Sequence, residues 1–81
     1  MTEQEARRLA EGQRAAAHVD AGWRVVASER RFILLAGEDR EQPAPVRDTL
    51  VWIVRFGGGL SWAELALDDR SGALLRVERS R

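Results

Sequence analysis

The sequence predicts an α+β fold, in which an N-terminal helix packs on one face of an antiparallel sheet of about four strands that ends in a β-meander. Three observations lead to this prediction. The first residues are rich in strong helix formers. The rest of the chain contains apolar runs dense in β-branched and aromatic residues. Glycine, proline and aspartate, which favour turns, separate these runs.

A helix is expected over about 3–18. Thr2 and Glu5 have the spacing of a capping box at its start. A stripe of mostly alanine recurs at helical spacing, so the helix can lie close to a sheet. This stripe comprises Ala6, Leu9, Ala10, Gln13, Ala16 and Ala17. Gly22 supplies a stop, and we expect the helix to end near His18 or Val19.

Strands are expected at about 23–36, 49–56, 60–67 and 73–79. The first segment is either one long bent strand or two short ones, because Glu29–Arg31 interrupts its apolar pattern. Segment 37–48 holds both prolines and many charges, and we expect a flexible loop there. Gly57–Gly59 predicts a hairpin turn, and Asp68–Gly72 has the composition of a tight turn before the last strand.

Length and composition exclude several classes of protein. With 81 residues, the chain is expected to form a single domain over 1–81 with one core. It has no cysteine and one histidine, which removes thiolate and iron–sulfur chemistry and the usual zinc sites. We therefore expect no cofactor and no metal.

The charge balance bears on partners and location. The chain has 13 basic and 13 acidic residues. Its net charge is therefore zero, and no net electric field steers it to nucleic acid or anionic lipid. All the basic residues are arginine, which with abundant alanine and glycine indicates a GC-rich bacterium. No apolar run approaches the ~20 residues of a membrane span, and the acidic start is unlike a signal peptide. We expect a cytoplasmic protein without nucleic-acid or membrane partners.

The order of these elements resembles a PepSY-type domain. The resemblance is most specific from about Thr49 onward and includes the run Trp52–Phe56. In that family the last hairpin carries an Asp, two residues and a Gly before an apolar strand, as Asp69-Arg70-Ser71-Gly72 does before Ala73–Leu75. The resemblance implies a non-catalytic module of the kind found in propeptides of secreted metallopeptidases and in membrane-associated proteins. Inhibitory or regulatory roles are implied with it.

The face of the sheet that the helix leaves uncovered is a candidate interface. Val51 and Ile53 point away from Leu50 and Trp52 and would form an apolar patch for a partner or a second copy. Alternatively, the long loop or the segment around Trp23 folds over them.

Other residues are candidates for an interface because of a large aromatic ring or a positive charge. Trp62 is a possible anchor, because large amphipathic rings are often interface hot spots. Arg30 and Arg31, with Arg24 nearby, form a basic cluster that suits an acidic partner. Solvated charges that deter aggregation at a strand edge are the alternative explanation of this cluster.

No pattern of catalytic residues is present, so we expect no enzyme and no catalytic residues. Ser61 and Ser71 lack the glycines of a nucleophile elbow. Asp68 and Asp69 have turn spacing rather than calcium-loop spacing, and Gly57–Gly59 lacks the Lys-Ser/Thr ending of a P-loop.

The sequence thus predicts a non-catalytic protein-binding or regulatory module, as a peptidase inhibitor or an assembly partner. Self-association as a dimer stays open. Two alternatives remain. One is a small inhibitor or immunity protein encoded by a phage or toxin locus. The other is a small-molecule binding domain with a pocket lined by Trp23, Trp52 or Trp62.

Overall fold

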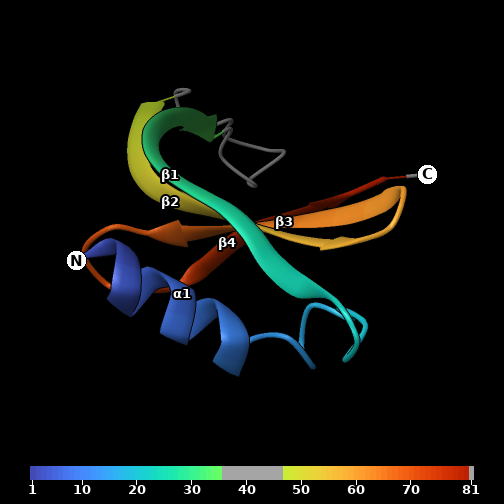
Figure 1. The fold of residues 1–81 in the computed structure, drawn as a ribbon. Helices are drawn as coiled ribbons and strands as arrows, with labels where there is room; N and C mark the ends of the chain where they lie inside the picture. The colour runs from blue at the N-terminus through green and yellow to red at the C-terminus, as the bar shows by residue number, and fades with distance from the viewer. Residues whose placement is uncertain (36–46, 81) are drawn as a thin grey trace.

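Each strand of the sheet pairs with its neighbour in the chain. The computed structural model describes residues 1–35 and 47–80. These form α1 (Glu3–Gly12), β1 (Arg24–Leu35), β2 (Arg47–Gly58), β3 (Ser61–Asp68) and β4 (Leu74–Arg79). The strands make one antiparallel sheet in the order β1-β2-β3-β4, and α1 lies alone on one side of it (Figure 1). The predicted α+β fold with a C-terminal meander is confirmed.

The start of α1 is as predicted, and its end is not. The Glu5 backbone N–H donates to the Thr2 hydroxyl at 3.2 Å, and the Thr2 N–H donates to the Glu5 carboxylate at 3.4 Å, which completes the capping box. The predicted end near His18 is wrong, because α1 ends at Gly12. Residues 13–18 form irregular turns, which His18 closes with a left-handed φ of 56°.

The side chain of Arg14 holds these turns in place. Its Nη1 donates to the carbonyl oxygens of Asp20 at 2.8 Å and Trp23 at 2.6 Å. Its Nε and Nη2 donate to the carboxylate of Glu11. The guanidinium also lies 4.7 Å from the centre of the buried Phe56 ring. One cation therefore joins the end of α1, the start of β1 and the core.

The main core lies between α1 and the sheet. Alanines of α1 and of the following turns pack against large side chains of β2 and β3, so the short helix sits close to the strands. The buried members of this helix-side core are Ala6, Ala10, Ala17, Val19, Val54, Phe56, Ala63, Leu65 and Leu67. The predicted alternation of β2 is confirmed, because Val51 and Ile53 belong to a separate cluster.

The hairpin of β1 and β2 reaches beyond the other strands. β1 is a single strand with a bulge between Val25 and Ala27, which decides between the two possibilities for this segment. Arg47 and Asp48, expected in the loop, belong to β2, and residues 37–46 of that loop lie outside the described residues. β3 pairs with β2 only from Val51 onward, so the far end of the hairpin has two strands. It bends away from α1 (Figure 1), as twisted two-stranded ribbons do.

The glycine triplet serves two purposes. Gly59 begins the two-residue turn to β3 with a φ of 69°, the sign that the first central residue of a type II′ turn needs. Gly58 leaves room for a ring, because a Cβ on Gly58 would lie 2.0 Å from Nε1 of Trp23. Trp23 itself packs against the helix-side core.

Gly58→Ala is expected to lower the free energy of unfolding by about 1–3 kcal/mol, because the added methyl forces the Trp23 indole out of its position. Urea unfolding followed by tryptophan fluorescence measures both the loss and the change around Trp23. Gly12→Ala is the matched control. No atom lies within 4 Å of the Cβ it adds, so we expect it to raise stability by at most about 1 kcal/mol. Equal unfolding midpoints for the two variants would contradict this account.

Arg14→Lys is expected to lower the free energy of unfolding by about 2 kcal/mol, because an ammonium keeps the charge and cannot hold both carbonyls and the Glu11 carboxylate. Arg7→Lys is the control, since Arg7 has exposed partners, and we expect a change within about 0.5 kcal/mol. Chemical unfolding at neutral pH measures both. A loss at Arg7 as large as that at Arg14 would show that Arg14 has no special role.

Candidate functional site

Val51 and Ile53 lie on the sheet face opposite α1, as expected, and are only 0 % and 4 % exposed. They form a second, smaller core cluster with Ile33 and Ala66. The structure therefore favours burial of this pair over an open apolar patch. The segment around Trp23 does not cover them, because Trp23 packs against the core on the other face.

Ion pairs surround this smaller cluster. The sheet face opposite α1, here called the polar face, carries three pairs: Arg31–Glu29 at 3.1 Å, Arg55–Glu64 at 2.9 Å and Arg76–Glu78 at 3.2 Å. Each arginine has an acidic partner within the same chain, so these charges largely neutralise one another.

Trp62 also lies on the polar face and is half-buried. The guanidinium of Arg55 stacks 4.7 Å from the centre of its ring, and the Arg55 Nε donates to Glu64 at 2.9 Å. The indole is thus engaged with a side chain of its own chain. A partner that used Trp62 as an anchor would have to displace Arg55.

The predicted basic cluster at Arg30 and Arg31 is divided between the two faces of β1, because successive residues of a strand point to opposite sides. The Arg30 guanidinium lies 5.8 Å from the centre of the Trp52 ring and 3.9 Å from the Asp69 carboxylate, on the side of α1. Arg31 lies on the polar face, and Arg24 is at the other end of the strand. The expectation of one cluster was wrong for this reason.

Two exposed apolar side chains at the far end of β1 were missed by the sequence reasoning. Phe32 is 66 % exposed and Leu34 is 63 % exposed. They alternate with the buried Ile33 and lie on the same face as Leu50, at the end of the hairpin that α1 leaves uncovered. The alternation was visible in the sequence, but both faces of this run are apolar. The pattern therefore did not indicate which face meets solvent.

β1 is also an edge of the sheet. It pairs with β2, and no other strand of residues 1–35 and 47–80 pairs with its outer side. Such edges can add a strand from another chain. The bulge between Val25 and Ala27 protects the start of this edge, and the charges of Glu29–Arg31 restrict which strands can join it, whereas Phe32 and Leu34 are apolar and exposed. The outer side of β1, together with Phe32 and Leu34, is here called the β1 edge.

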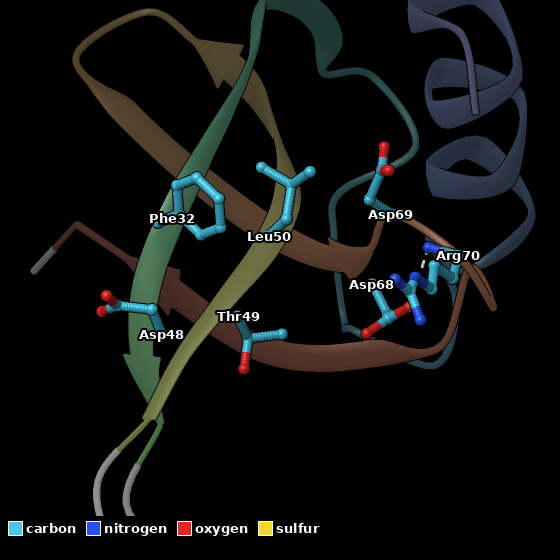
Figure 2. A pocket seen from close by; sticks show the side chains of 7 residues that line it. All are labelled: Phe32, Asp48, Thr49, Leu50, Asp68, Asp69 and Arg70. Carbon is cyan, nitrogen blue, oxygen red and sulfur yellow. Dashed lines mark hydrogen bonds between the residues drawn. The ribbon is translucent and has the colours of Figure 1, made fainter.

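A hollow of about 530 Å³ lies beside this edge, between the end of the hairpin and the turn after β3. Figure 2 shows Phe32 and Leu50 side by side on neighbouring strands, with Asp68–Arg70 across from them. Asp48 and Thr49 line the part nearest the hairpin end. The hollow is open and of mixed polarity, so it is a surface depression next to an apolar strand end.

Two of the carboxylates around this hollow already have partners. Asp68 Oδ1 accepts the backbone N–H groups of Arg70 at 2.8 Å and Ser71 at 2.9 Å. Asp69 Oδ1 lies 3.4 Å from the Met1 ammonium, which also donates to the Asp69 carbonyl oxygen at 3.1 Å. These acids therefore stabilise the β3–β4 turn and its contact with the N-terminus.

Metal ligands, membrane-spanning helices and the positions of the three tryptophans can also be assessed in the described part of the chain. Among the residues it describes, no group of three or more His, Asp or Glu side chains could hold a metal ion. None of the helical segments in that part of the chain has the length and apolar character needed to cross a membrane. Trp23 and Trp52 pack on the helix-side core and Trp62 on the polar face, so the three rings do not line a common pocket.

Asp68 should make stability depend on pH in the acid range. Hydrogen bonds from the backbone N–H groups of Ser71 and Arg70 hold the pKa of its carboxyl below the ordinary value. A folded-state pKa below the unfolded one means that the carboxylate stabilises the fold above its ordinary pKa. That stabilisation is lost as the pH falls through the folded pKa. Asp68→Asn keeps an acceptor and removes the titration, so its unfolding midpoint should fall less on acidification than that of the wild type. If the unfolding midpoints of the two proteins fell by the same amount on acidification, this role of Asp68 would be contradicted.

Comparison of the chain with family models, curated proteins and solved structures finds no match to any of them. The resemblance to PepSY-type domains therefore stays a prediction from the sequence, and the function has to be argued from the site itself.

Proposed function

We propose that this chain is a non-catalytic protein-binding module that receives its partner at the β1 edge. The observation that carries the proposal is the exposure of Phe32 and Leu34, at 66 % and 63 %, on a strand whose outer side is unpaired within the described residues. An added strand gains backbone hydrogen bonds from the edge and apolar contact from these two side chains. Both contributions come from the same few residues.

The polar face is a less suitable binding surface than the β1 edge, and this comparison supports the proposal. Its apolar residues Val51 and Ile53 are already buried, and its charges already form ion pairs. A partner on this face would gain little apolar burial and would have to compete with these pairs. At the β1 edge, two apolar side chains, Phe32 and Leu34, already lie in solvent and are available to a partner.

A regulatory role is the form of binding that we favour. The resemblance to PepSY-type domains supports a module that restrains a peptidase or assists an assembly. Strand addition at an edge suits this role, because an extended segment of the partner would be held in place by the sheet. The proposal includes no catalytic step.

Phe32→Asp and Leu34→Asp should each abolish capture of protein partners by the immobilised chain, because a charge is placed where apolar contact is needed. Leu60→Asp is the matched control. Leu60 is a fully exposed leucine at the β2–β3 turn, away from the β1 edge.

Lysate of the source organism is passed over all four proteins, and the retained proteins are identified by mass spectrometry. The proposal expects a set retained by the wild type and Leu60→Asp and lost in the other two. Identical sets from all four proteins, or no protein retained, would overturn it.

A further inference from the structure

We infer that the partner at the β1 edge is a second copy of this chain, whose β1 pairs antiparallel with the first about a two-fold axis. The inference rests on the proposed function, since it names the occupant of the same edge. It is carried by a charge pattern that makes β1 complementary to itself.

The complementary charges are Glu29 and Arg31. They lie on the same face of β1, opposite Ile53 and Val51 of β2. In an antiparallel pair, residues directly opposite each other share a face, and a two-fold axis makes every such contact occur twice. With the axis at Arg30, Glu29 of each copy lies opposite Arg31 of the other. Two ion pairs therefore cross the interface, and opposite charges in this position favour pairing.

Both side chains are available for this exchange. Within one chain Glu29 and Arg31 form an ion pair of 3.1 Å, and their side chains are still 60 % and 48 % exposed. Pairing of two copies would replace or share this contact without burying a charge that lacks a partner. A strand with an acidic residue opposite Glu29 or a basic residue opposite Arg31 would bring like charges together, so the pattern also limits which strands can join.

Arg30, which lies on the two-fold axis, is compatible with this register. Two Arg30 side chains would face each other there, but each is drawn over its own sheet. The guanidinium lies 3.9 Å from the Asp69 carboxylate and 5.8 Å from the centre of the Trp52 ring. Both contacts direct the positive charge toward β2 and away from the outer edge.

The same register also pairs backbone groups on the outer side of β1. It pairs residues 27–33 of the two copies, the part of β1 that follows the bulge between Val25 and Ala27. Phe32 of each copy then lies opposite Ser28 of the other, beside the start of α1, where Ser28 accepts a hydrogen bond from Arg7. The product is a continuous sheet with both helices on one face. Each copy would retain β4 as its outer edge.

The test is a pair of charge reversals measured by sedimentation across a concentration series. Wild type is expected to form a dimer. Glu29→Arg and Arg31→Glu each bring like charges together twice, and dimerisation should weaken by about tenfold or more. An equal mixture of the two variants should regain the dimer, because Arg at position 29 then meets Glu at position 31 of the other chain. Native mass spectrometry distinguishes this mixed dimer by its mass.

The β4 edge provides the matched control. Arg76 and Glu78 form a similar ion pair of 3.2 Å on the opposite edge, which takes no part in the proposed interface, and Arg76→Glu and Glu78→Arg should therefore leave the dimer unchanged. Circular dichroism checks that all variants are folded. A monomeric wild type at every concentration would overturn self-pairing while leaving the capture experiment to decide the broader proposal. A dimer that the mixture does not restore, or that the β4 variants weaken equally, would overturn the register.

Discussion

One short helix cannot cover a sheet of four strands, and the rest of the molecule reflects this constraint. α1 has ten residues and is therefore about 15 Å long, which is enough to cover the middle of the sheet. On the other face, a small apolar cluster around Val51 is surrounded by ion pairs. At the far end of the β1–β2 hairpin, neither α1 nor a ring of ion pairs covers the apolar residues. Phe32 and Leu34 are therefore exposed to solvent. The candidate site is thus the apolar surface that the helix leaves uncovered.

In addition to the packing of its alanines, cations bind backbone carbonyls on both sides of α1. Arg14 bonds two carbonyl oxygens beyond the C-terminal end. Arg79 of β4 donates to the carbonyl oxygens of Ala17 and His18. At the other end the Met1 ammonium donates to Asp69. Charged donors form stronger hydrogen bonds than neutral ones, so a few contacts suffice to fix the helix.

The fold class and the strands followed from periodicity and turn residues, because these signals are local. The end of α1 did not, since the alanines after Gly12 favour a helix, whereas Arg14 draws the chain toward β1. The face of Val51 was predictable from alternation, but its burial depends on tertiary packing. Phe32 could not be assigned as exposed, because the run around it is apolar on both sides and only the length of α1 decides which side is covered.

The order of the strands has a consequence for how the protein folds. Every strand pairing joins neighbours in the chain, so each closes only a hairpin, and loop-closure entropy is small. A sheet of this kind can grow by one strand at a time, and the newest strand is its edge until the next one forms. Among the described residues the sheet ends at β4, which carries Arg76, Glu78 and Arg79. β4 thus ends one side of the sheet with charged residues, whereas β1, on the other side, has the exposed Phe32 and Leu34.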